Sequence, residues 1–155
     1  MVDNAASDWM LPVSFHFLVD FQNKLEHFQT SFKEVSGLNI KFEAEKRPND
    51  TGIWIKMPHK LMYGNITVKR HVGIKSDDKF TKWVNTNLNR DADQYIRIYN
   101  MVIKLLDSNH KPLAGWNCSG VFPIQWDLST LDAEKSELAL ETVVLTCNRI
   151  GRITV

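Results

Sequence analysis

The chain has 155 residues, of which 43% are apolar and 24% are charged, and its 19 basic and 18 acidic side chains leave a net charge of +1. This length predicts one domain with a sizeable core. The near-neutral balance argues against binding to nucleic acid or a membrane surface through bulk charge. No apolar run approaches the roughly 18 residues of a membrane-spanning helix. The N-terminus lacks the basic and apolar regions of a secretory signal, so we expect a cytoplasmic protein until another process moves it.

The first half of the chain predicts strands. Apolar residues occupy every odd position from Val13 to Phe21, which is the period of a half-buried strand. A second strand is expected over residues 28–38, with a bulge or kink at Gly37. Residues 40–45 alternate again and predict a third strand.

Residues 46–63 break this pattern. Prolines at positions 48 and 58 argue against a central strand, and turn-forming residues surround the apolar island Ile53-Trp54-Ile55. This composition predicts an excursion from the sheets rather than an ordinary hairpin loop. An exposed Trp on such a segment favours contact with a partner, because leaving the island in water forfeits about 25 cal/mol per Å² of apolar area.

One segment has the period of a helix. After an alternating strand over residues 66–70, Ser76 stands at the position of an N-cap, with Asp77 and Asp78 in the expected first turn. Apolar residues then recur at i, i+3, i+4 and i+8, which predicts a helix with one apolar stripe packed on the core. The expected anchor residues are Phe80, Trp83, Val84 and Leu88.

The C-terminal third predicts more strands and completes a mainly β fold. Strands are expected over residues 95–106, 114–127, 138–147 and 150–155, with interruptions at Gly120 and Pro123. Together with the single helix they predict a two-sheet β-sandwich or barrel. We find no internal repeat or linker, so residues 1–155 are expected to form one domain with residues 1–11 as an N-terminal arm.

Residues for catalysis are missing from the sequence. The five histidines form no metal-binding pair, and there is no nucleophile elbow, phosphate-binding glycine loop or dinucleotide fingerprint. Asp77 and Asp78 fit helix capping better than acid–base chemistry. Cys118 and Cys147 lie in apolar, strand-like surroundings and are expected to be free, buried thiols. We therefore expect no enzyme, no cofactor and no metal site.

The order of these elements resembles the tail-tube protein family of contractile phages and phage-tail-like contractile injection systems. The resemblance covers roughly residues 11–147. Its most specific pieces are Phe32-Lys-Glu-Val-Ser-Gly-Leu38, Lys69-Arg70 before the helix, the strand through Pro123, and the Leu140-Glu-Thr strand. Relatives often have a glycine directly after the Lys-Arg pair, whereas this chain has His71-Val72-Gly73.

The resemblance implies hexameric rings that stack into a hollow tube, with a long loop reaching the neighbouring ring. It implies as partners other copies of the chain, contractile sheath subunits, baseplate or hub proteins and cargo in the lumen, without a membrane anchor or sequence-specific nucleic acid. It also implies assembly into a phage-tail-like particle, including an extracellular one. The excursion matches the long loop, so we expect a ring-stacking interface there. Its expected residues are Pro48, Ile53, Trp54, Ile55, Met57 and Pro58.

Two alternatives stay open at this stage. One is a tube-initiation or baseplate ring protein of the same fold, which forms rings without polymerising. The other is a β-barrel module that binds a small apolar ligand, suggested by the Phe-rich strand face and the capping helix.

Overall fold

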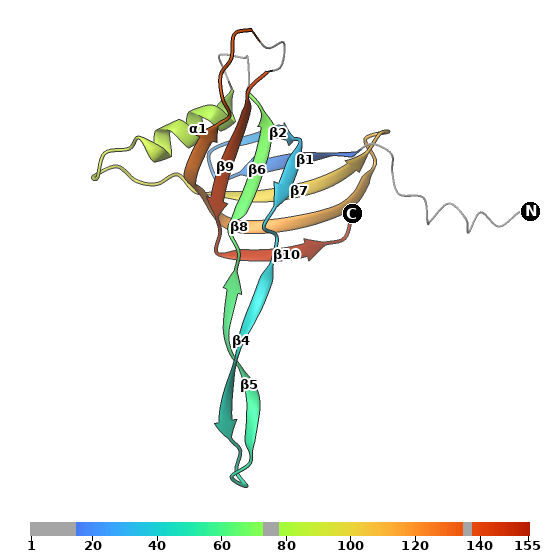
Figure 1. The fold of residues 1–155 in the computed structure, drawn as a ribbon, viewed down its shortest axis with the longest axis vertical. Coiled ribbons are helices and arrows are strands. Elements are labelled where there is room, and N and C mark those ends of the chain that lie inside the picture. Colours follow the sequence, from blue (N-terminus) through green and yellow to red (C-terminus); the bar gives the residue numbers. More distant parts are fainter. Residues whose placement is uncertain (1–14, 73–77, 135–137) are drawn as a thin grey trace, which may run out of the picture.

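The fold consists of strands that wrap around a core closed by one helix. The structure, a computed structural model, describes residues 15–72, 78–134 and 138–155, and these contain ten strands and one helix (Figure 1). In chain order they are β1 (Phe15–Gln22), β2 (His27–Phe32), β3 (Glu34–Ser36), β4 (Ile40–Pro48), β5 (Trp54–Tyr63), β6 (Ile66–His71), α1 (Lys79–Leu88), β7 (Tyr99–Asp107), β8 (Pro112–Leu128), β9 (Leu140–Thr146) and β10 (Arg149–Ile153).

The 17-residue strand β8 joins two sheets. Its first half pairs antiparallel with β7 and β10, and its second half pairs with β9. The hydrogen-bonded order is β2-β1-β7-β8-β9-β6-β3, and β6 and β9 run across β1 and β7 in Figure 1. The changeover falls at Gly120, whose φ of 65° favours glycine and bends the strand. The prediction of a mainly β, two-sheet fold with one helix is confirmed.

Several predicted strand boundaries are wrong. The single strand expected over residues 28–38 is two strands, because β2 pairs with β1 whereas β3 pairs with β6 in the other sheet. The strand expected from Tyr95 begins at Tyr99, and the Tyr95 side chain is almost fully exposed. Strand β8 continues through Gly120 and Pro123, and the interruptions expected there take the form of shifts in its pairing register with β7 and β9.

An aromatic cluster forms the centre of the core. Phe21 on β1 stacks on Phe28 at 5.0 Å between ring centroids and lies 5.2 Å from the Trp83 ring on α1. Tyr99 on β7 meets the Trp83 ring edge-on at 5.1 Å. The helix therefore covers the core by packing its Trp83 against aromatic side chains of β1 and β7.

The buried stripe of α1 differs from the predicted one at its last position. Phe80, Trp83 and Val84 are at most 3% exposed, but Leu88 is 38% exposed and lies outside the core. Asn87 is buried in its place, 7% exposed, because its side-chain amide exchanges hydrogen bonds with the backbone of Arg97. These two bonds satisfy a polar group that would otherwise be costly to bury.

The predicted start of the helix is also wrong by two positions. The helix begins at Lys79 with Asp78 at the N-cap, so Asp78 precedes the first turn instead of filling it. Ser76, Asp77 and the expected arm over residues 1–11 lie outside the described residues.

Both cysteines are free, as the sequence predicts. Cys118 is fully buried between β7 and β10, whereas Cys147 is half-buried. Burial, followed by the proximity of Cys147, raises the pKa of the Cys118 thiol to about 12, and burial also raises the pKa of Cys147. At neutral pH both groups are therefore protonated and poorly nucleophilic.

We expect Cys118 to resist maleimide at pH 7.5 in the folded protein and to react fully in denaturant, with Cys147 reacting slowly in the folded state. Mass spectrometry of labelled and unlabelled protein measures both. Fast labelling of Cys118 in folded protein, or a mass two protons lower before reduction, would contradict the free, buried thiols described here.

Candidate functional site

A long two-stranded hairpin projects from one end of the sheets. Strands β4 and β5 pair antiparallel from Ile40–Tyr63 at the root to Pro48–Trp54 at the tip, and they pair with no other described strand (Figure 1). At about 3.3 Å per residue the arm is ~30 Å long. The excursion predicted over residues 46–63 is thus real, but it begins at Ile40 and is an ordinary hairpin in its pairing.

The two prolines are compatible with this hairpin for local reasons. Pro48 is the last residue of β4, and Pro58 pairs with Ala44 next to a β-bulge. Both strands are edge strands, so backbone N–H groups that point outward need no partner in the ladder. The prediction that these prolines lie outside a central strand is confirmed, because β4 and β5 pair with no other described strand.

Two glycines fix the ends of the hairpin. At the tip, Gly52 has a φ of 81°, and the Asn49 side chain accepts hydrogen bonds from the backbone of Thr51 and Ile53. At the root, Gly37 has a φ of 82°, and a Cβ atom there would lie 1.9 Å from the backbone oxygen of Asn65. Only glycine fits this root, which sets the direction in which the arm leaves the sheets.

The pairing register divides the hairpin into two faces. One face gathers mostly apolar residues, and we call it the hairpin apolar face. Its members are Ile40, Phe42, Ala44, Pro48, Trp54, Pro58, Leu61 and Tyr63, together with Lys46 and Lys56. On the opposite face, Glu45 pairs with Arg47 at 2.9 Å and with His59 at 3.1 Å.

The hairpin apolar face is exposed to solvent. Trp54, Phe42 and Ile40 are 68%, 61% and 52% exposed. Lys46 and Lys56 stand directly opposite each other in the register, and in the described part of the chain neither has an ion-pair partner. Like charges facing each other across two strands destabilise the pairing. An apolar face of this size with unpaired charge is typical of a surface that binds another protein.

The six residues predicted for an interface all lie exposed on this hairpin but do not share one face. Pro48, Trp54 and Pro58 belong to the hairpin apolar face, whereas Ile55 and Met57 lie on the opposite face. Ile53 lies in the tip, 62% exposed. The sequence prediction missed Ile40 and Phe42, which it places in a strand of the body, and Leu61, which lies within the predicted excursion but was not among its interface residues.

A buried arginine fastens α1 to the sheets. Arg70 on β6 is 9% exposed and donates from Nε to Glu141 on β9 at 2.5 Å, from Nη1 to Thr30 at 2.9 Å and from Nη2 to Asp78 and Thr81. Its guanidinium also lies 4.7 Å from the centre of the Phe80 ring. One side chain therefore links β2, β6, β9 and the first turn of the helix.

Arg70 lowers the pKa of Asp78, the N-cap residue of α1. Burial alone raises the pKa of Asp78, but hydrogen bonds from Arg70 and Thr81 and the arginine charge outweigh burial and hold this pKa below its ordinary value. Asp78 is therefore ionised at neutral pH, where its charge complements both Arg70 and the positive end of the helix.

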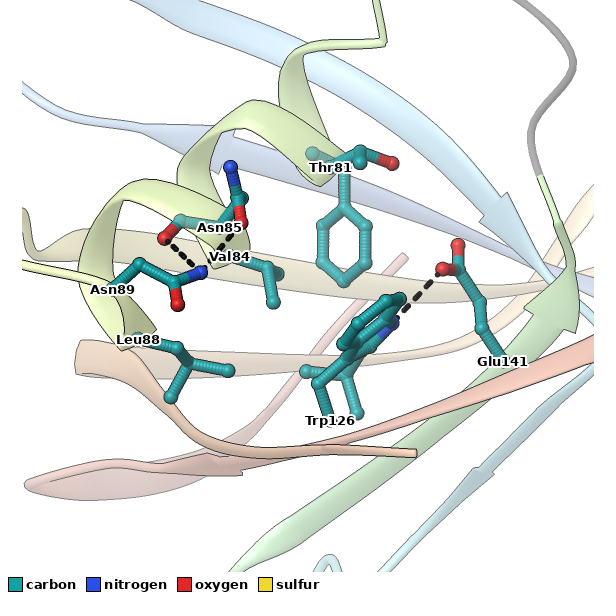
Figure 2. Close-up of a pocket in the computed structure, with 9 residues that line it drawn as sticks. Thr81, Val84, Asn85, Leu88, Asn89, Trp126 and Glu141 are labelled. Carbon is teal, nitrogen blue, oxygen red and sulfur yellow. Dashed lines mark hydrogen bonds between the residues drawn. The ribbon is translucent and has the colours of Figure 1, made fainter. Parts of the chain in front are cut away.

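A groove of about 220 Å³ lies between α1 and the ends of β8 and β9, and we call it the α1 groove. Figure 2 shows Leu88 and Val84 on one side of it and Trp126 on the other. Trp126 is 47% exposed, and its Nε1 donates to Oε2 of the buried Glu141 at 3.2 Å. The residues that line the α1 groove are Phe80, Thr81, Val84, Asn85, Leu88, Asn89, Trp126, Glu141 and Val143.

The described residues contain neither a cluster of metal ligands nor a helix that could span a membrane. Within residues 15–72, 78–134 and 138–155 no three His, Cys, Asp or Glu side chains lie close enough to hold a metal ion. In the same residues, the helix is too short and too polar to cross a membrane.

The sequence of residues 13–150 matches the family described as T4-like virus tail tube protein gp19. The chain belongs to this tail tube protein family. Tail tube proteins are structural, so the predicted function as a tail tube subunit of a phage tail or contractile injection system is confirmed, and so is the prediction that the chain is not an enzyme. A comparison with curated proteins finds no match.

Solved structures show the same tube fold. A chain of the PVC sheath-tube complex of an extracellular contractile injection system, in its extended state, has a TM-score of 0.76 at 24% identity and covers 100% of this tail tube protein and 99% of its own length. A chain from the tube-terminating cap of the anti-feeding prophage has a TM-score of 0.72 at 26% identity, over 94% and 93% of the two chains. Hcp1 from Salmonella typhimurium is more distant, with a TM-score of 0.54 at 9% identity over 91% and 92%.

Proposed function

We propose that six copies of this tail tube protein form a ring and that the rings stack head to tail into the hollow inner tube of a contractile injection system. In this proposal residues 1–155 act as one tube domain. The family membership supports a tube subunit, and the PVC relative comes from a sheath-tube complex. Sheath subunits, baseplate proteins and cargo are the corresponding partners, with assembly starting in the cytoplasm and ending in a released particle.

Open strand edges support ring formation. In the described part of the chain, β2 and β10 lie at the two ends of the sheet that contains β1, β7 and the first half of β8, and the outer edge of each is unpaired. Unpaired edges of this kind template further pairing, and a closed ring removes them. A contact between unlike edges that closes by rotation gives a cyclic oligomer.

The exposed hairpin apolar face is the observation that carries the stacking part of the proposal. The arm pairs with neither edge strand and extends well beyond the sheets on the side where β10 lies, so it reaches past its own subunit towards a neighbour along the tube axis (Figure 1). Its exposed Trp54 and Phe42 would be covered there. Ring formation and ring stacking then depend on different parts of the molecule.

We expect Trp54→Ser, or a short Gly/Ser bridge that replaces Asn49–Lys56, to leave soluble rings and to abolish tubes, because the arm loses its apolar contact. Trp54→Phe keeps an aromatic side chain and serves as the matched control that still forms tubes. Sedimentation and negative-stain electron microscopy measure both states. Full-length tubes from the bridged variant would refute the stacking role, and loss of rings would show that the arm belongs to the fold of the subunit.

A tube-end ring protein is the second candidate. The comparisons that support it are with chains of the anti-feeding prophage baseplate and cap, at 24% and 26% identity and the same TM-score of 0.72. Under that alternative the purified chain gives rings and no tubes even without substitution. The Phe-rich strand face and the helix, which suggested a ligand cavity, pack against each other through Phe21, Trp83 and Tyr99, so we do not favour the ligand-binding alternative.

A further inference from the structure

The hairpin and the segment that follows Trp126 differ in charge. The hairpin, residues 40–63, has five basic and three acidic residues, and two of the basic ones, Lys46 and Lys56, lie on its apolar face. The segment 127–134 at the end of β8 has three acidic residues and no basic one. This segment follows Trp126 of the α1 groove directly in the chain, and its Asp132 lines a second groove, formed by residues 129–133 and 138–140.

These two surfaces lie at opposite ends of β6. The hairpin returns to the body just before Ile66, where β6 pairs with Leu145 of β9. The α1 groove lies at the other end of the strand, where Arg70 pairs with Glu141. Figure 1 shows the same arrangement, with the hairpin extending away from the end that holds α1. A head-to-tail stack therefore brings the hairpin of one copy to the α1 end of the next.

The two surfaces also match in chemistry. The α1 groove is lined by apolar side chains that remain partly exposed, Leu88 at 38% and Trp126 at 47%. The hairpin apolar face presents Trp54, 68% exposed, close to the tip of the arm. Apolar surface on both sides is removed from water by contact, and the lysines beside Trp54 meet the acidic segment.

We propose that the α1 groove is the receptor for the hairpin of a second copy in the adjacent ring. Trp54 docks between Leu88 and Trp126, and Lys46 and Lys56 pair with Asp132 and Glu134 of the acidic segment. This inference rests on the proposed function, because it names the partner site of the stacking hairpin. The contact is heterologous, so it repeats along an axis without closing.

The first test places a charge in the receptor. Leu88→Lys introduces a cation where the basic hairpin is expected to dock, and we expect the mass of tubes in the pelleted fraction to fall at least tenfold while rings remain. Thr86→Lys is the matched control, because Thr86 is exposed on the same helix but faces a different groove, beside Arg97. Tubes from Leu88→Lys in the amount formed by the parent would overturn the proposal.

A charge exchange tests the pairing directly. Lys46→Glu/Lys56→Glu alone and Asp132→Lys/Glu134→Lys alone are each expected to form rings without tubes. The chain with all four substitutions is expected to recover tubes, because every interface then has glutamates on the hairpin and lysines on the receptor. Failure of the combined chain to recover tubes, with its rings intact, would refute the assigned pairs.

Photo-crosslinking locates the contact without weakening it. Benzoylphenylalanine in place of Trp54 in assembled tubes is expected to give adducts to residues 84–89 or 126 of another copy, identified by mass spectrometry. Adducts only to other segments would overturn the receptor assignment. If the unsubstituted chain forms no tubes, the proposed function fails. If it forms tubes that need the hairpin but tolerate Leu88→Lys, only this inference fails.

Discussion

Replacing Trp83 by alanine is expected to lower the free energy of unfolding by about 3–5 kcal/mol, which is the usual effect of removing a large aromatic side chain from a core. Trp83 is 3% exposed, lies 5.9 Å from the Phe80 ring and donates from Nε1 to the backbone oxygen of Arg97 at 2.9 Å. The substitution leaves a cavity at the centre of the aromatic cluster and removes one of the two side-chain hydrogen bonds to that oxygen. Equilibrium unfolding in urea measures the change.

Ring stacking has to be removed from this measurement and the ring state held constant, because subunit association stabilises the folded state by mass action. The variant with the Gly/Ser bridge, which is expected to form rings but no tubes, is a suitable background when all variants are compared at one protein concentration. Leu88→Ala is the matched control on the same helix and is expected to cost about 1 kcal/mol or less, because Leu88 is partly exposed. Equal losses from the two substitutions would show that Trp83 is not the anchor of the helix.

Replacing Arg70 by methionine is expected to cost about 3–5 kcal/mol, because it leaves a buried carboxylate without its partner. Glu141 is 4% exposed and, among the described residues, keeps the hydrogen bond from Trp126 alone, and Asp78 loses the arginine that lowers its pKa. The helix also loses its tie to β6 through Asp78 and Thr81. Thermal unfolding in the same background measures the effect.

A double substitution separates the pair from the packing. Arg70→Met/Glu141→Leu removes both buried charges, so we expect it to recover at least half of the loss of the single change.

Stability should also become less sensitive to acid in Arg70→Met. A carboxyl group with a lowered pKa in the folded state stabilises the fold above its unfolded pKa, and this contribution is lost as pH falls through the folded pKa. An unchanged acid limb in the single variant would contradict this assignment.

The sequence predicted α1 well because its apolar residues recur at a helical period, and three of the four expected anchors are buried. It failed at the last position, where hydrophobicity favours Leu88 over Asn87. The structure buries Asn87 because the Arg97 backbone supplies both a donor and an acceptor, and that backbone belongs to a loop whose course sequence periodicity does not give. Leu88 is thereby left free to line the α1 groove.

The hairpin shows a second limit of sequence patterns. Alternation at Ile40, Phe42 and Ala44 is the same whether a strand faces its own core or a partner molecule. The prolines predict that the outer part of the arm lies outside the sheets. The sequence predicts only a bulge or kink at Gly37, where the root of the arm lies. Burial of Arg70 was also not predictable, because it depends on pairing with Glu141, 71 positions away in the chain.

The shared strand β8 has a mechanical consequence. Because one continuous backbone is hydrogen bonded to β7 and β10 in its first half and to β9 in its second, the two sheets cannot slide past each other without breaking that ladder. A force applied at the α1 end is therefore transmitted to the sheet around β1 and β7 through the backbone hydrogen bonds of β8. Side-chain contacts, which break one at a time, contribute less. The two sheets therefore respond to force as one rigid unit, and the two-stranded arm is the element that bends most easily under compression.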